Sequence, residues 1–229
     1  MPDFIEVPNG AGVTIMESSR SDRPEYEPFT PSSYYYLFDF EKEIQTSGTY
    51  YLVIYQYTSE GRYAMAVGYK EEFTILEWLK IPVDVIEIHQ WEEKPLYLIF
   101  APLIVTVIVG FVLLIWKFKM KLTIFRVLGA SAGLIYLGTR FMILMQMIIA
   151  LSSSIFNSLI LLSIIFVVIP LLLGFASLRK ITRIDEEISM RDRFVWLTIG
   201  VLGLFTWSGL FLGPVLSILL ALNPYKEVS

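Results

Sequence analysis

The sequence predicts an integral membrane α+β protein, in which an N-terminal extracytoplasmic β-sandwich-like module precedes a four-helix transmembrane bundle. The segment 96–116 has 21 residues without a charge, enough at about 1.5 Å per residue to cross the ~30 Å hydrocarbon core of a bilayer. Residues 34–69 are dense in aromatic and β-branched residues, which favour strands. Residues 1–95 hold 17 of the 22 acidic residues but only 7 of the 18 basic ones. This division of charge indicates two modules in two environments.

The composition excludes several kinds of chemistry. The chain has no cysteine and a single histidine, His89, so it cannot supply disulfides, thiolate nucleophiles, cysteine-bound metals or a pair of haem-binding histidines. No serine-hydrolase, phosphate-loop, zinc-protease or dinucleotide-binding motif occurs. The basic residues lie between long apolar stretches, where they orient helices, so no nucleic-acid partner is expected. We therefore predict a protein that is not an enzyme and has no cofactor and no metal site.

Residues 1–70 form the predicted extracytoplasmic module. A short strand is expected at 12–17, and the proline-rich stretch after it is expected to be a loop. Three runs that begin near residues 34, 49 and 61 are then predicted to be strands joined by tight turns. Both faces of the middle run are largely apolar, which is typical of a central strand covered on both sides.

The beginning of the chain leaves the route of export open. The first 20 residues have neither the basic start nor the apolar core of a signal peptide. Either the helix at 96–116 exports the residues before it, or a signal peptide precedes Met1. We favour the second alternative.

The run SGTYYLVIYQYTSEGRYAMAVG resembles the final hairpin of the pre-peptidase C-terminal type of jelly-roll domain. In that family a Gly-Thr-Tyr-Tyr strand leads through a glycine turn to a strand bearing tyrosine and valine. The resemblance covers about residues 34–69 and implies an extracytoplasmic β-sandwich with a binding or accessory role. The leading strands of a full jelly-roll do not fit before Tyr34. The sandwich is therefore either incomplete here or smaller and completed by a partner.

Residues 71–95 are predicted to be an amphipathic collar at the outer membrane surface. Thr74 and Glu77 match a helix capping box, and Pro82 is expected to start a second short helix. Aromatic residues of this region are expected to lie at the level of the lipid headgroups. These candidate anchors are Trp78, Trp91 and Tyr97.

Residues 96–222 are predicted to cross the membrane four times, at about 96–116, 124–151, 154–178 and 194–222. The first and third connections together carry nine basic residues, whereas the second has no charge. By the positive-inside rule, the basic connections face the cytoplasm. The N-terminal module and the C-terminal tail, 223–229, are then extracytoplasmic in a multi-pass protein of the cell membrane. The nine basic residues are Lys117, Lys119, Lys121, Arg126, Arg179, Lys180, Arg183, Arg191 and Arg193.

Arg140 is the candidate interaction residue inside the membrane. It lies 14 residues after Arg126, about 21 Å further along the same helix. None of the four predicted spans contains Asp or Glu, and an intramembrane charge costs at least about 2.5 kcal/mol on insertion scales. Arg140 therefore binds an anion or an acidic group of another subunit, or its side chain extends to the outer interface. Both alternatives stay open.

Two pairs of glycines have the GxxxG spacing that lets helix backbones approach closely. We expect packing within the bundle, with oligomerisation as the alternative. Met142, Met145 and Met147 do not line one helical face, so packing is preferred to copper binding. His89 has carboxylates nearby in sequence, but a solvated acidic face is preferred to a metal site. The glycines are Gly129, Gly133, Gly209 and Gly213.

These features predict a non-catalytic, membrane-anchored recognition or accessory subunit whose outward β module binds a protein partner or an extracellular ligand. The expected partners are membrane lipids and another membrane or extracytoplasmic protein, or a second copy of the chain. The alternative is an oligomeric transporter or channel subunit in which Arg140 interacts with anions. A redox or copper-binding membrane protein is a third, less favoured class.

Overall fold

The computed structural model describes residues 6–43, 45–55, 61–68, 72–183 and 189–222. Its elements are two short strands, six α-helices and one 3-10 helix. In chain order they are β1 (Glu25–Glu27), β2 (Ser32–Tyr34), α1 (Ile75–Trp91), α2 (Leu96–Trp116), α3 (Ile124–Ser153), α4 (Ile160–Arg183), α5 (Met190–Phe205), η1 (Ser208–Phe211) and α6 (Leu212–Leu222).

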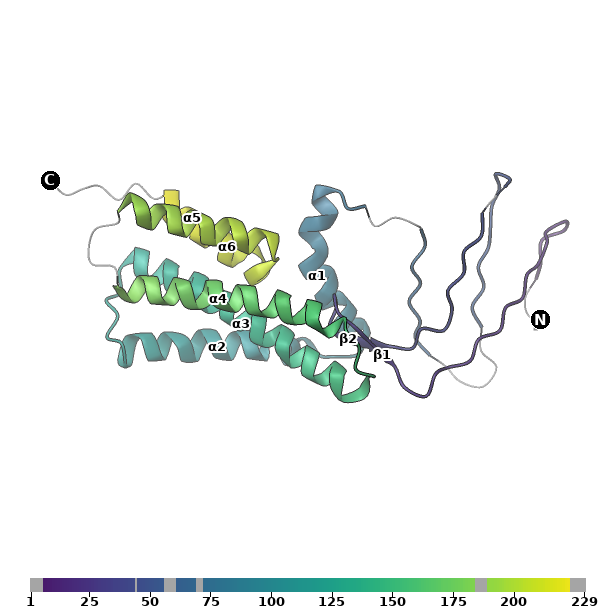
Figure 1. The fold of residues 1–229 in the computed structure, drawn as a ribbon, viewed down its shortest axis with the longest axis horizontal. Helices are drawn as coiled ribbons and strands as arrows, with labels where there is room; N and C mark the ends of the chain where they lie inside the picture. The colour runs from purple at the N-terminus through teal and green to yellow at the C-terminus, as the bar shows by residue number, and fades with distance from the viewer. Residues whose placement is uncertain (1–5, 44, 56–60, 69–71, 184–188, 223–229) are drawn as a thin grey trace.

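Helices α2, α3 and α4 run side by side, with α5 and α6 lying along them (Figure 1). All three are long and apolar enough to cross a membrane. Helix α3 is the centre of the bundle because it contacts α2, α4 and α6. Its inner face is closed by large apolar side chains, and Tyr136 and the α5 residue Trp196 are fully buried. Helix α2, by contrast, has only 11% of its most apolar 18-residue stretch buried, so most of its apolar surface is not covered by the rest of the described chain.

The prediction of a fourth span over residues 194–222 is wrong. The chain reverses at 206–211, and α6 returns along α5, so its last residue, Leu222, lies at the same end of the bundle as the start of α5 (Figure 1). Three non-glycine residues of the reversal have positive φ, namely Trp207 (45°), Leu210 (50°) and Phe211 (63°). Hydropathy missed the reversal because an apolar stretch has the same hydropathy whether it runs straight or folds back. The bundle thus has three candidate spanning helices and a helical hairpin, and the predicted outer tail, 223–229, lies outside the described residues.

The predicted β-sandwich is also not formed. In the described parts of residues 1–70, the only sheet is the antiparallel pair β1–β2. The stretches 35–43, 45–55 and 61–68 contain no strand, although they run as elongated segments (Figure 1), and the predicted strand at 12–17 is absent. The physical reason is that strands need an apolar face to bury, and side chains such as Tyr51 and Val67 remain 75% and 84% exposed.

The β1–β2 hairpin instead closes the end of the bundle where α3 connects to α4. Tyr26 is fully buried, and its hydroxyl donates to Ser163 Oγ on α4 at 2.8 Å. Ser163 in turn donates to the carbonyl of Pro28 at 2.8 Å, and the amide of Ile155 donates to the carbonyl of Pro24 at 2.9 Å. Residues 18–33 were expected to be a loop, so this docking contact was missed. A tyrosine flanked by two prolines gives no periodic pattern to detect.

Helix α1 lies across the bundle rather than along it (Figure 1). It begins with the predicted capping box, in which Thr74 accepts from the amide of Glu77 and the Glu77 side chain accepts from the amide of Thr74. The helix continues through Pro82, so the expected second helix does not form separately. Trp91 and Tyr97 are exposed, as predicted interfacial anchors require, whereas Trp78 is half-buried.

Candidate functional site

The best-defined polar site surrounds Arg140, where α3 and α4 meet the tip of the α5–α6 hairpin. The guanidinium is 3% exposed. Its Nη1 donates to the carbonyl of Phe166 at 3.2 Å, and its Nη2 donates to the carbonyls of Thr206 and Trp207 at 3.2 and 3.1 Å. The carbonyls of Thr206 and Trp207 follow the end of α5 and have no partner inside that helix. The carbonyl of Phe166 lies inside α4, four residues before Pro170, which has no amide hydrogen to donate to it. Arg140 therefore satisfies acceptors that the end of α5 and Pro170 leave open.

Thr139, the neighbour of Arg140, holds the other side of the reversal. Its Oγ1 accepts from the amide of Gly209 at 3.2 Å and donates to the carbonyl of Ile135 at 2.9 Å. Gly209 has φ +62°, a conformation in which a side chain is strained, and a Cβ there would lie 3.0 Å from Ile135 Cγ2. Arg140 and Thr139 together therefore fix a turn whose backbone is unfavourable for most residues.

An aromatic cluster joins the hairpin tip to α4 and α1. Trp207 stacks on Phe166, with ring centroids 5.8 Å apart. Trp78 of α1 lies 5.7 Å from Trp207 and 5.6 Å from Phe211, and the Trp207 indole donates to the Trp78 carbonyl at 3.2 Å. Trp78 thus contacts the α5–α6 hairpin, and its position at the level of the lipid headgroups stays a prediction. The cluster consists of Trp78, Phe166, Trp207 and Phe211.

In the described chain, the contacts of Arg140 are mainly with the backbone and not with an acidic side chain. None of the ion pairs among the described residues includes Arg140, and Nη1 and Nη2 donate to backbone carbonyls. Nε is buried without a partner in the part of the chain that the structure describes. The guanidinium neither extends to the surface nor faces an acidic group here. Sequence reasoning found the charge but not its partners, because backbone carbonyls leave no trace in a sequence.

The predicted glycines all contact other parts of the same chain. A Cβ at Gly129 would lie 2.8 Å from Ile181 Cγ2, and one at Gly133 would lie 2.8 Å from Leu178 Cδ2, so this pair faces α4. Gly209 lies in the reversal and Gly213 in α6, where a Cβ would lie 3.0 Å from Tyr136 Cε1. The second pair therefore does not form one helical GxxxG face.

A compact charged cluster lies where α1 ends. Glu92 accepts from Lys94 Nζ at 2.7 Å, and His89 Nδ1 lies 3.0 Å from the same carboxylate oxygen. Burial raises the pKa of Glu92, but hydrogen bonds from His89, Lys94 and Ser32 outweigh it and hold the pKa at about 2. Ser32 belongs to β2, so the N-terminal hairpin lies beside this carboxylate at the end of α1. Among the described residues, no group of three or more ligands suited to a metal ion is found.

The cluster predicts a stability change in acid. Because the folded-state pKa of Glu92 lies below the unfolded value of about 4.3, its stabilisation is complete above that pH and is lost as the pH falls toward 2. We expect Glu92→Gln to be less stable than the wild type at pH 6, by up to about 3 kcal/mol, with the difference vanishing near pH 2. Unfolding in detergent at a series of pH values measures this. Glu87→Gln, which changes an exposed carboxylate of α1, is the control, and an equal loss in that variant contradicts the prediction.

The fold and site define a membrane protein with three candidate spanning helices, a helical hairpin held by a buried arginine, and a surface helix seated on that hairpin. No protein-family model matches the chain, and no curated protein and no solved structure matches it either. The resemblance of residues 34–69 to the pre-peptidase C-terminal family stays a prediction.

Proposed function

We propose that this protein is a non-catalytic, membrane-anchored recognition or accessory subunit that binds a protein partner outside the cytoplasm. The observation that carries the proposal is the exposure of large apolar side chains along the extended stretches between β2 and α1. Contiguous exposed apolar surface on a folded chain marks an interaction site. The exposed residues are Tyr36, Leu37, Phe38, Phe40, Tyr50, Tyr51, Leu52, Val53, Ile54, Tyr63, Met65 and Val67.

The chemistry of these stretches favours a protein partner. They are rich in the aromatic and β-branched residues that favour strands. Figure 1 shows elongated segments over the described parts 35–43, 45–55 and 61–68, and none of these parts is paired in a sheet. An extended backbone gains main-chain hydrogen bonds by pairing with the edge of a partner's sheet, and its alternating side chains then fill the partner's pockets. The partner that fits is one with an exposed β edge flanked by apolar surface.

The contacts of α1 link this binding segment to the membrane helices. Arg62, in the third extended stretch, donates to the carbonyl of Trp91 and pairs with Glu93 at the end of α1. The N-terminal half of α1 packs on the α5–α6 hairpin, where Trp78 contacts Trp207. A partner bound to the extended stretches is therefore held close to the bundle, as an accessory subunit requires.

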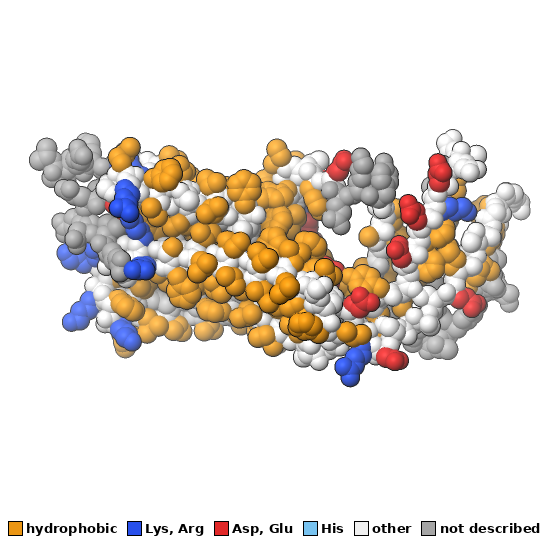
Figure 2. Space-filling model, in the orientation of Figure 1, with side chains coloured by type: hydrophobic (Ala, Val, Ile, Leu, Met, Phe, Trp, Pro, Cys, Tyr) orange, Lys and Arg blue, Asp and Glu red, His pale blue; other side chains and the backbone are white. Residues whose placement is uncertain are grey.

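The proposed orientation places the N-terminal segment outside and the basic ends of the helices in the cytoplasm. Figure 2 shows acidic side chains on the N-terminal part and basic side chains gathered at the opposite end of the bundle. Basic residues near helix ends remain on the cytoplasmic side during insertion. The chain has no cysteine, so Val67→Cys and Lys119→Cys each give a single thiol. We expect a membrane-impermeant maleimide to label only Val67→Cys in intact cells, and the reverse pattern refutes the orientation.

Photo-crosslinking in native membranes tests the proposed binding. A benzophenone amino acid at position 51 or 67 is expected to give one discrete adduct with a second protein, which also copurifies in a fixed ratio. The same group at Val112, a 44% exposed position of α2, is the control and is expected to give no such adduct. Adducts with only a second copy of the chain, together with anion flux that Arg140→Leu abolishes, favour the transporter alternative. No adduct at either position refutes the proposal.

A further inference from the structure

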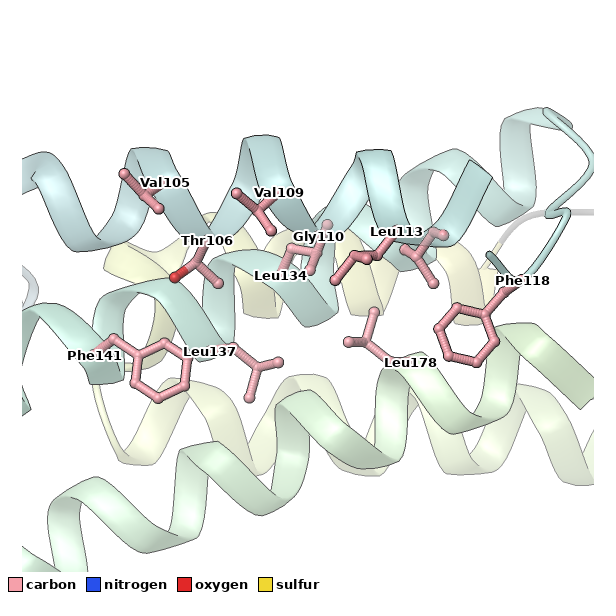
Figure 3. Close-up of a pocket in the computed structure, with 11 residues that line it drawn as sticks. Val105, Thr106, Val109, Gly110, Leu113, Phe118, Leu134, Leu137, Phe141 and Leu178 are labelled. Carbon is pink, nitrogen blue, oxygen red and sulfur yellow. The ribbon is translucent and has the colours of Figure 1, made fainter. Parts of the chain in front are cut away.

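An apolar groove of about 360 Å³ lies between α2, α3 and α4 (Figure 3). Its α2 wall includes Val105, Val109 and Leu113, and Leu178 of α4 lies on the opposite side. The only hydroxyl in the lining, that of Thr106, donates to the carbonyl of Pro102 at 2.6 Å. The groove thus offers apolar contacts and no free polar group to hold a water-soluble ligand.

One end of the groove lies beside basic residues. Phe118 and Leu178 line that end, and their sequence neighbours Lys117, Lys119 and Arg179 are exposed. None of these three cations forms an ion pair with a carboxylate in the described part of the chain. The nearby Lys180, by contrast, pairs with Asp192. An apolar groove that ends at exposed cations matches a molecule with an apolar tail and an anionic head.

The length and exposure of the groove identify the bilayer as the source of that molecule. Its α2 wall runs from Val105 to Leu114, about 14 Å at 1.5 Å per residue. This is about half of the ~30 Å hydrocarbon core, or one leaflet. Because α2 is largely unburied, a lipid tail can enter sideways from the membrane.

We propose that the groove binds an acyl chain of an anionic phospholipid, whose phosphate is held by Lys117, Lys119 and Arg179. Basic sites between transmembrane helices bind anionic headgroups, and each nearby Lys or Arg strengthens that attraction. The apolar wall supplies contacts common to any acyl chain, and the cations supply the preference for negative charge. This inference does not depend on the proposed protein partner.

Native mass spectrometry of the full chain in detergent, with equal phosphatidylglycerol and phosphatidylcholine added, tests the proposal. We expect the wild type to retain one phosphatidylglycerol, with a preference over phosphatidylcholine of at least about tenfold. Val109→Trp fills the groove and is expected to lose the bound lipid. Ile108→Trp is the matched control, because Ile108 is 59% exposed on the same helix and does not line the groove.

The double variant Lys117→Gln, Lys119→Gln tests binding of the headgroup separately from binding of the acyl chain, because neither lysine lines the groove. It is expected to retain one lipid while losing most of the preference for phosphatidylglycerol. Equal retention of the two lipids by the wild type overturns the proposal. So does equal lipid loss in Val109→Trp and Ile108→Trp, or an unchanged preference in the double variant.

Discussion

Replacing Arg140 with leucine is expected to free the tip of the α5–α6 hairpin and to lower the free energy of unfolding by about 3 kcal/mol or more. The substitution removes the donors that Arg140 supplies to the partly buried carbonyls of Phe166, Thr206 and Trp207. A hydrogen bond to a charged group contributes about 1.5–3 kcal/mol, and an unsatisfied buried acceptor costs about 1–3 kcal/mol. The measurement is equilibrium unfolding in mixed micelles, combined with the reaction rate of a single thiol at Leu210→Cys.

Two further variants are expected to give smaller losses of stability than Arg140→Leu. Arg140→Lys keeps the charge but replaces a planar, forked donor with one ammonium group, so we expect an intermediate loss and partial exposure of the thiol at position 210. Thr139→Val removes the hydrogen bond from the Gly209 amide and the hydroxyl's bonds to the carbonyls of Ile135 and Tyr136, and its loss is expected to be about 1 kcal/mol. If Arg140→Leu leaves both stability and thiol protection unchanged, aromatic packing alone holds the hairpin.

The part of the fold that sequence reasoning recovers is the part governed by long, uniform apolar runs. The predicted span 96–116 coincides with α2 (Leu96–Trp116), and the span 124–151 ends two residues before α3 does. Such runs need no tertiary information, because the bilayer alone dictates a helix for them. The span predicted at 154–178 is α4, shifted to Ile160–Arg183, since the residues before it bind the β1–β2 hairpin instead of continuing the membrane helix.

The features that sequence reasoning missed depend on contacts between distant residues. The chain reversal at 206–211 is stabilised by Arg140 and Thr139, about 70 residues earlier in the chain. Tyr26 is buried in a cluster with Met147, Ala150 and Ile160, and Ser163 of α4 accepts from its hydroxyl. The tyrosine-rich stretches have the composition of a sandwich, but the chain brings no second apolar layer against them in the described residues. Local propensity therefore predicted strands where tertiary packing supplies none.

Gly138 of α3 packs directly against the backbone of α2, and enlarging it is expected to separate the two helices. A Cβ at this position would lie 3.0 Å from the Leu103 Cα and 3.1 Å from the Leu103 carbonyl oxygen. These are backbone atoms of a helix, so they cannot move aside as the end of a side chain can. Gly138 lies five residues after Gly133, outside the GxxxG spacing, and the spacing rule did not identify it.

Gly138→Leu is therefore expected to cost about 3 kcal/mol, at the upper end of the usual range for overpacking. Helix α2 is mostly unburied, so few other contacts compensate for its displacement from α3. The measurements are the free energy of unfolding in mixed micelles and the monodisperse fraction after purification. Ala176→Leu adds a similar volume at an exposed position of α4 and is expected to be nearly neutral. Equal stability of the two variants contradicts the close α2–α3 contact, whereas an intermediate loss in Gly138→Ala supports it, because one methyl group already meets the Leu103 backbone.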